Sequence, residues 1–473
     1  MPDPGPNAPV PESPSPSFGP RPNTDADLLR LQYEKPTSVR WLVFTLACVT
    51  SWMLYLHRYT WNLITPELIK EYGWSREKVG LLYTCFTPAY GGGQIPSGVL
   101  CDWLGPHLFL GGIILLWSVA LPLHGLQTGF SGLAGVRVLF GAAQAGGYPA
   151  LSKITYSWFP QRSRTGVQGW VATFFGRSGG AMSSILMGTV LMALLGLTWR
   201  QSLIMLGLMG VVFAVVFAVV FRNSPDEHPS VNRAERELIN EGRTPPAPGS
   251  RRGLPWGRAL NNRSMVFFVI QQMTSAGADM AYVAFMGDYF INAKGFDMKT
   301  AGLLISLPLW GGAAGGIFAG YFSDWLIPRI GSRRWGRVAV GFSGKFIACL
   351  LMFLAIQQQS GLMAGLVLFF VKFFTDWSQP TVWGACTDIG GRYSATVFGI
   401  INTAGSVGGL ITPWLFGRIV DYSTASRIVE GVEEKIVNYN PMLATVALLY
   451  LISALAWFFV DCSKPLDQDD EAD

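Results

Sequence analysis

Charged side chains interrupt the long apolar runs of this 473-residue chain at several points. A lone charge in a hydrocarbon environment costs several kcal/mol unless it is solvated or paired, so such residues mark binding sites and ion pathways. A planar guanidinium matches the geometry of a carboxylate or a phosphate, and the arginines therefore predict recognition of an anion. The charges are Arg58, Arg137 and Arg177 in the first half, and Asp279, Lys345, Lys372 and Asp376 in the second.

Arg58 is the main candidate for contact with an anion. It lies near the middle of the first apolar run if that helix continues to about Lys70; otherwise its side chain extends to the outer membrane surface. Arg177 lies in a string of glycine and serine, and it is either a second anion contact or the partner of a buried acid. The uncharged side chains that could orient a hydroxylated substrate are Tyr90, Tyr148, Gln271, Gln272 and Asn402.

Three residues are candidates for the uptake of a proton. An aspartate in a medium of low dielectric constant can exchange protons near neutral pH, which makes Asp279 and Asp376 candidates. His57 titrates in the same range when it is unperturbed. The alternative for Asp376 is a structural pair with Lys372, because residues i and i+4 share a helix face. Arg137 is either a member of a packing pair or part of a gate.

The composition places these residues in a membrane protein. Half of the chain is hydrophobic and 14% is charged, against about 25% charged residues in a typical soluble domain. This excludes a soluble enzyme, a disordered chain and a nucleic-acid-binding protein. The net charge of +5 is attributed to Lys and Arg retained on the cytoplasmic side of a membrane. The six cysteines have no C-x-x-C spacing, so neither a metal site nor a disulfide framework is expected.

The apolar runs supply the elements that must position these residues. Each is long enough to cross a hydrocarbon core about 30 Å thick. They predict an all-α membrane protein with twelve transmembrane helices in two pseudo-symmetric bundles of six. The predicted spans are 41–69, 79–101, 108–128, 132–156, 166–192, 200–221, 264–291, 299–326, 337–358, 361–388, 394–419 and 441–461.

Arginine is concentrated between the sixth and seventh spans, and the positive-inside rule therefore places this segment and both termini in the cytoplasm. An amphipathic stretch from Val231 to Glu241 predicts a short helix there. Lys153 is expected at the membrane interface. The predicted organisation is a disordered tail over 1–40, a six-helix bundle over 41–221, a linker over 222–263, a second six-helix bundle over 264–461 and an acidic tail over 462–473.

Two short patterns occur once in each half of the chain. Gly98–Leu104 and Gly320–Leu326 both read G-x-x-x-D-W-L, and Thr165–Gly169 has a weaker counterpart in Ala395–Gly399. Both patterns return after six spans with the same sidedness. This is the parallel repeat of a transporter with two six-helix halves.

The G-x-x-x-D pattern, followed by basic residues, resembles the cytoplasmic signature of the major facilitator superfamily. The second copy keeps the acid and two of the following bases, Arg333 and Arg334. The resemblance covers about residues 41–461 and implies a twelve-span transporter that works by alternating access. It also implies that Asp102 and Asp324 hold a cytoplasmic gate shut through neighbouring helix ends.

Within the superfamily, three stretches are similar to the anion:cation symporters, which carry sugar acids in bacteria and organic anions in animals. They are Tyr55-Leu-His57-Arg58, Tyr90-Gly-Gly-Gly-Gln94-Ile-Pro96-Ser-Gly98 and Ser157-Trp158-Phe159-Pro160. The resemblance implies a carrier for an organic anion, often driven by H⁺ or Na⁺, in which Arg58, Tyr90 and Asn402 contact the substrate. The acids that serve proton coupling in bacterial members are replaced here by His57 and Gln144.

The sequence therefore predicts a secondary active transporter of a small organic anion in the cell membrane, with H⁺ or Na⁺ as a candidate coupling ion. The alternatives are an organophosphate/phosphate antiporter, a membrane-embedded enzyme and a non-transporting sensor. Span seven lacks the arginine typical of organophosphate antiporters, the four histidines lack metal-ligand spacing, and no loop is long enough for a signalling domain. The expected partners are the solute and the lipid bilayer, without nucleic acid, cofactor or metal, and the expected state is a monomer.

Overall fold

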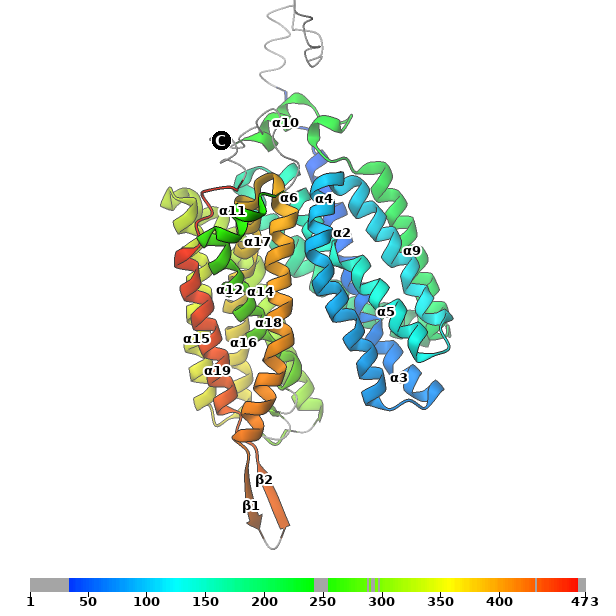
Figure 1. The fold of residues 1–473 in the computed structure, drawn as a ribbon, viewed down its shortest axis with the longest axis vertical. Coiled ribbons are helices and arrows are strands. Elements are labelled where there is room, and N and C mark those ends of the chain that lie inside the picture. Colours follow the sequence, from blue (N-terminus) through cyan, green and yellow to red (C-terminus); the bar gives the residue numbers. More distant parts are fainter. Residues whose placement is uncertain are drawn as a thin grey trace, which may run out of the picture.

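The computed structural model describes residues 34–241, 254–286, 289–290, 294–296, 298–429 and 432–466. Its helices form two bundles that stand side by side, with the first half of the chain in one and the second half in the other (Figure 1). Long apolar segments become helices because a backbone in hydrocarbon must satisfy its hydrogen bonds within the segment. The predicted all-α architecture of two bundles is confirmed.

The first bundle contains the six spans predicted for the first half. Two of these spans follow each other within α4 (Arg76–Leu126). Gly105, with a φ of 78°, breaks the helical geometry between them. The fifth span alternates α-helical and π-helical turns. The elements are α2 (Val39–Tyr59), α3 (Trp61–Tyr72), α4 (Arg76–Leu126), α5 (Phe130–Ala145), α6 (Gly147–Trp158), η1 (Gln161–Ser163), α7 (Arg164–Gln168), η2 (Gly169–Phe175), α8 (Gly176–Ser183), η3 (Ser184–Leu194) and α9 (Trp199–Val220).

The second bundle contains the six spans predicted for the second half. Its elements are α12 (Arg263–Ala284), α14 (Met298–Ile330), α15 (Arg333–Gln357), α16 (Gly361–Trp377), α17 (Gln379–Gly390), η6 (Gly391–Tyr393), α18 (Ser394–Tyr422), α19 (Asn440–Ala456) and η7 (Trp457–Phe459). An antiparallel hairpin of β1 (Ala425–Val429) and β2 (Val432–Ile436) joins α18 to α19 and projects from the end of the bundle (Figure 1). The apolar pattern does not predict this hairpin.

Six helical segments among the described residues satisfy the length and hydropathy that a membrane crossing requires. Two of them, Lys78–Leu126 and Gly361–Tyr422, each hold two predicted spans in succession. The predicted spans outside these segments include the fifth, which carries Arg177 among glycine and serine residues. Small and polar residues of this kind are tolerated where a helix packs against other helices instead of lipid.

The segment between the bundles folds back onto the start of the first span. It contains η4 (Pro225–Glu227), α10 (Arg233–Asn240) and α11 (Trp256–Asn261). Glu235 of α10 is fully buried and accepts hydrogen bonds from the Thr37 hydroxyl, from the backbone N–H groups of Val39 and Arg40 at 3.2 and 3.1 Å, and from the Arg40 guanidinium at 3.0 Å. A carboxylate at a helix N-terminus satisfies free N–H groups and complements the helix dipole. The predicted amphipathic helix thus anchors α2.

Replacing Glu235 by alanine is expected to destabilise the protein by about 2–4 kcal/mol, because buried donors at the start of α2 lose a charged acceptor. Glu237→Ala on the same helix is the matched control. Its carboxylate is largely exposed and pairs with Arg233 at 2.7 Å one turn away, an interaction worth about 0.3–0.5 kcal/mol. Thermal unfolding of the purified protein measures both variants. Equal melting temperatures for the two would show that the anchor contributes nothing.

The chain after η7 remains packed for several residues. Cys462 and Leu466 are buried, and the backbone N–H of Leu466 donates to the carbonyl of Ile389 at 2.9 Å. Residues 462–466 of the predicted acidic tail therefore belong to the folded structure, because the side chains of Cys462 and Leu466 are buried against the second bundle. The remainder of that tail (467–473), most of the predicted N-terminal tail (1–33) and part of the linker (242–253) lie outside the described residues.

Candidate substrate site and contact between the bundles

A cavity of about 250 Å³ lies between the two bundles and is lined by both. The first bundle contributes residues of α2, α4, α6, η2 and α8, and the second contributes residues of α12, α16, α17 and α18. A polar cavity at a repeat interface is the usual substrate position in carriers built from two repeats. Seven predicted site residues line it: Tyr90, Tyr148, Arg177, Gln272, Asp279, Asp376 and Asn402.

An ionic network crosses the cavity. Arg177 of α8 forms an ion pair with Asp376 of α16, which connects the first bundle to the second. Lys372 lies 2.9 Å from Asp376 and 2.6 Å from Asp279 of α12. The predicted pair between Lys372 and Asp376 is confirmed, and Arg177 is the partner of a buried acid. Low dielectric constant makes such charges costly unless each is paired, which explains why they occur together.

Arg58 lies directly behind the wall of the cavity. Its Nε donates to the Gln144 Oε1 at 3.0 Å, and its guanidinium lies 4.3 Å from the ring centre of Tyr90 and 5.1 Å from that of Tyr55. Both tyrosines line the cavity, whereas Arg58 does not. Its Nη2 is buried without a hydrogen-bond partner. The side chain is therefore held among aromatic rings by cation–π contacts, and it does not extend to the membrane surface.

Aromatic rings from both bundles form one end of the cavity. Tyr148 lies nearly parallel to Trp383 and Phe398, with ring centres 6.3 Å apart in each pair. Its hydroxyl lies 3.0 Å from the Ser51 Oγ, so its polar end is satisfied within the first bundle. Phe398 is two residues beyond Thr396, which binds Asp102 of the first bundle. This aromatic layer therefore packs the two bundles against each other beside the cavity.

Polar contacts near the cavity also join α4 to α18. The Asn402 side chain donates to the Gln94 Oε1, and the Gln94 Nε2 donates to the Ser406 Oγ at 3.3 Å. The Thr403 hydroxyl donates to the carbonyl of Gly91 at 3.0 Å. Asn402 thus faces the cavity with its amide already bound across the interface. Gln94 has no predicted role, although it lies within the Tyr90–Gly98 motif.

Three predicted residues are not brought to the cavity. His57 of α2 is fully buried against α9. A Cβ atom built on Gly210 of α9 would lie 2.8 Å from the His57 Cε1. Gln271 donates to the Ser453 Oγ at 3.2 Å inside the second bundle. Arg137 is buried in the first bundle, with its guanidinium 4.2 Å from the ring of Trp61. Their predicted roles in coupling, substrate contact and gating are not supported, because each side chain faces the interior of its own bundle.

The two aspartates of the repeated pattern bind helix starts of the opposite bundle. Asp102 accepts hydrogen bonds from the Thr396 N–H at 2.9 Å and the Thr396 hydroxyl at 2.6 Å. Asp324 accepts from the Gly166 N–H at 2.7 Å. Thr396 and Gly166 belong to the second pair of related segments, so the two sequence repeats are the two partners of one symmetric contact. A carboxylate is favourable at a free helix N-terminus, which supports the gating role predicted for both aspartates.

Further polar contacts reinforce this side. Lys153, which is predicted at the membrane interface, lies 2.9 Å from Asp102 and also donates to the carbonyl of Arg392 in the second bundle, so its side chain links the two bundles. Arg337 is buried, lies 2.8 Å from Asp388 and donates to the Thr165 hydroxyl at 3.1 Å. The bundles are therefore held together at this end of the molecule.

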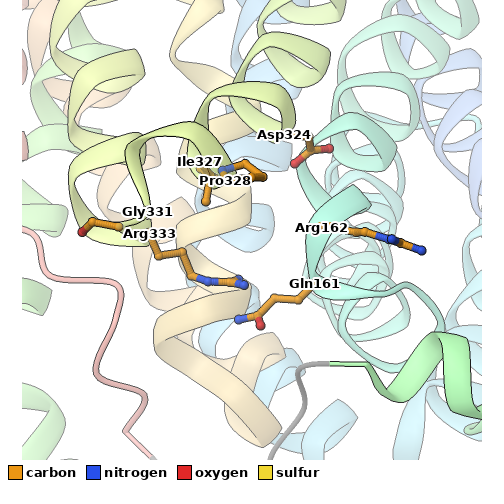
Figure 2. Close-up of a pocket in the computed structure, with 8 residues that line it drawn as sticks. Gln161, Arg162, Asp324, Ile327, Pro328, Gly331 and Arg333 are labelled. Atoms are coloured by element: carbon orange, nitrogen blue, oxygen red, sulfur yellow. The ribbon is translucent and has the colours of Figure 1, made fainter.

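A second cavity, of about 280 Å³, lies beside Asp324 at this contact between the bundles. Figure 2 shows Gln161 and Arg333 facing each other across it, whereas Arg162 points away. Arg162 pairs with Glu241 at 3.4 Å, and Arg333 lies 3.6 Å from Asp388. Since both arginines have acidic partners, this cavity belongs to the gate and is not a second anion site.

The fold and the site together define a membrane carrier, in which two helical bundles enclose a charged cavity and close on one side of it. The chain belongs to the Major Facilitator Superfamily, whose sequence model matches residues 41–413. Membership confirms the family and the twelve-span fold predicted from the sequence, and it identifies the chain as a transporter and not an enzyme.

Relatives of the chain carry organic anions. A probable sulfoacetate transporter of Cupriavidus necator is 28% identical over 435 residues, which cover 91% of this chain and 96% of the relative. A probable galactarate/D-glucarate transporter of Escherichia coli is 27% identical, with 82% of this chain and 88% of the relative covered. A D-galactonate transporter of Escherichia coli is 22% identical over 90% of this chain and 96% of the relative. The predicted resemblance to sugar-acid carriers is confirmed.

Two solved structures share the fold. The Escherichia coli fucose:proton symporter matches with a TM-score of 0.63 at 15% identity, over 89% of this chain and 99% of the symporter. A bacterial homologue of the iron transporter ferroportin, in an outward-facing state, matches with a TM-score of 0.64 at 10% identity, over 88% of this chain and 98% of that structure. At these identities the likeness shows the fold alone.

Proposed function

We propose that the protein is a secondary active transporter that moves a small organic anion, either a sugar acid or another carboxylate, by alternating access. The observation that carries this proposal is the cavity between the bundles, with Arg177 on its wall and Arg58 directly behind it. Guanidinium groups recognise carboxylates by paired, charge-assisted hydrogen bonds. The relatives named as sulfoacetate, galactarate and galactonate carriers support a carboxylate or sulfonate as cargo.

Each group of the cavity has a distinct part in this proposal. Arg58 supplies positive charge to the anionic end of the cargo, and Tyr90 presents a hydroxyl beside it. Gln272 and Asn402, on the opposite wall, orient hydroxyl groups of the cargo. A coupled H⁺ or Na⁺ would bind at Asp279 or Asp376, the acids among the described residues that line the cavity. Their contacts with Lys372 and Arg177 would then link cation binding to the separation of the bundles.

The orientation of the carrier is also part of the proposal. We place it in the cell membrane as a monomer, with both termini and the α10 segment in the cytoplasm. Two features support this: α10 and the described segment after η7 lie at the same end of the molecule (Figure 1), and the arginine-rich segments belong to that end under the positive-inside rule. The Asp102 and Asp324 contacts then form the cytoplasmic gate.

Uptake into proteoliposomes tests the function. A thermal-shift screen of sugar acids, other carboxylates and organophosphates first selects the anion, since a bound ligand stabilises the folded state. Arg58→Ala is expected to reduce its uptake by roughly 10- to 100-fold, because the cavity loses a positive charge close behind its wall, and Arg58→Lys is expected to retain part of it. Arg200→Ala is the control, because Arg200 forms a partly exposed pair with Glu71 at 2.6 Å. Uptake that is insensitive to Arg58→Ala would remove Arg58 from the site, and a wild-type protein that binds and moves no anion would refute the function.

A further inference from the structure

The charges around the cavity do not balance. Among the described residues, the charged groups that line it or lie directly behind it are Arg58, Arg177, Lys345, Lys372, Asp279 and Asp376. Arg177 and Lys372 form ion pairs with Asp279 and Asp376, and these four charges cancel. Neither Arg58 nor Lys345 forms an ion pair with a carboxylate that the structure describes. Two positive charges are therefore uncompensated.

Lys345 stands behind the wall formed by the second bundle. Its side chain comes from α15 and is 1% exposed. Its Nζ donates to the Ser275 Oγ at 2.6 Å and lies 5.5 Å from the ring centre of Tyr450. Ser275 itself lines the cavity. Because the Ser275 oxygen accepts from the ammonium group, its own proton can be donated to an anion in the cavity. A buried ammonium group without a carboxylate is costly, and an anion at Ser275 would offset that cost.

Arg58 has the corresponding position behind the wall of the first bundle. Its guanidinium donates a hydrogen bond to Gln144, which is a neutral amide and does not cancel the positive charge of Arg58. The rings of Tyr55 and Tyr90 lie between it and the cavity, and its Nη2 is buried without a hydrogen-bond partner. Each bundle therefore presents one uncompensated cation to the same cavity, from opposite walls.

We propose that the cargo is a dianion with a negative group at each end, one directed to the Arg58 wall and the other to the Ser275–Lys345 wall. Lys345 is the residue that selects for the second charge, through its own field and through the hydroxyl of Ser275. A monoanion leaves one of the two cations uncompensated, and it is bound more weakly for that reason. This inference rests on the proposed function and narrows its substrate class.

The test compares anions that differ by one charge. Galactarate is a dianion, and D-galactonate is the monoanion in which a CH₂OH group replaces one terminal carboxylate. Sulfoacetate and 2-hydroxyethanesulfonate form a second pair, in which a CH₂OH group likewise replaces the carboxylate. Binding to the purified full-length protein is measured by calorimetry. The wild type is expected to bind the dianion of at least one pair roughly tenfold more tightly or better than its monoanion, the effect of one hydrogen bond to a charged group. Lys345→Met is expected to abolish this preference and to leave monoanion affinity within about threefold.

Two further variants keep the result interpretable. Ser275→Ala removes the hydroxyl and leaves the lysine, and it is expected to reduce the dianion preference as well, so the inference remains testable if Lys345→Met does not fold. Lys294→Met is the control, because the Lys294 Nζ binds the backbone carbonyl of Gln358 at 2.6 Å, and it is expected to keep the preference. Equal wild-type binding of both members of a pair, or an equal loss of both in Lys345→Met, overturns the dianion inference and leaves the proposed function standing. Absence of binding by every anion overturns the proposed function itself.

Discussion

Gly98→Val is expected to reduce transport by about a hundredfold, because the cytoplasmic gate can no longer close. A Cβ atom at Gly98 of α4 would lie 2.6 Å from the carbonyl oxygen of Ala395 and 2.8 Å from the Cα of Thr396, both in α18 of the opposite bundle. These are backbone atoms that cannot rotate away, so the bundles must separate. Overpacking of this kind costs about 1–3 kcal/mol, which shifts a two-state equilibrium by roughly 5- to 150-fold.

The same helix provides the control. Gly92 is exposed, and no atom lies within 4 Å of a Cβ built there, so Gly92→Val is expected to transport normally. Spin labels at Trp103 and Trp325, which are exposed beside Asp102 and Asp324 on opposite bundles, report the proposed gate directly. Their separation is expected to increase in Gly98→Val and to remain unchanged in Gly92→Val. Normal transport by Gly98→Val with an unchanged separation would show that the contact is not a gate.

The second large effect is expected from removal of either charge in the ion pair between Arg177 and Asp376. Each single change, Arg177→Ala or Asp376→Asn, is expected to reduce transport by about a hundredfold or more, because breaking a buried pair leaves an uncompensated charge. The double variant Arg177→Gln/Asp376→Asn removes both charges and is expected to stay inactive, since Arg177 also faces the cargo in the cavity. Uptake and binding by the same preparations measure these effects.

A purely structural pair gives a different result. If the double variant regains wild-type transport, the two charges serve only to neutralise each other, and Arg177 has no part in binding. Glu71→Gln is the control for the loss of a carboxylate near an arginine. Glu71 pairs with Arg200 at 2.6 Å, but both side chains are partly exposed, so a small effect is expected.

Neighbouring residues show where prediction from the sequence stops. His57 and Arg58 are adjacent on α2, and the sequence makes both of them candidates for the site. In the structure Arg58 lies behind the cavity wall and His57 is buried against α9. Consecutive residues of a helix point about 100° apart, so they cannot share one face. The side chain that faces the cavity depends on how the helix is rotated within its bundle, and the pattern of residues did not decide that rotation here.

Pairing across helices shows the same limit. The pair of Lys372 with Asp376 is predictable, because four residues along one helix bring side chains together. The contacts of Lys372 with Asp279, of Arg177 with Asp376 and of Lys345 with Ser275 join residues on different helices. No local rule connects them. For the same reason, the sequence did not predict that Gln94 and Lys153 link the two bundles.

Hydropathy, charge and short motifs are properties of contiguous residues, so the amino-acid sequence alone was enough to predict the apolar spans, the twofold repeat and the family. Which charges meet in the cavity and which are left uncompensated is visible only in the folded structure. The structure also shows that the two repeated patterns contact each other across the bundles. These features depend on helix rotation and on contacts between residues hundreds of positions apart, and in a low-dielectric interior such contacts decide whether a charge is neutralised or is left to attract a ligand.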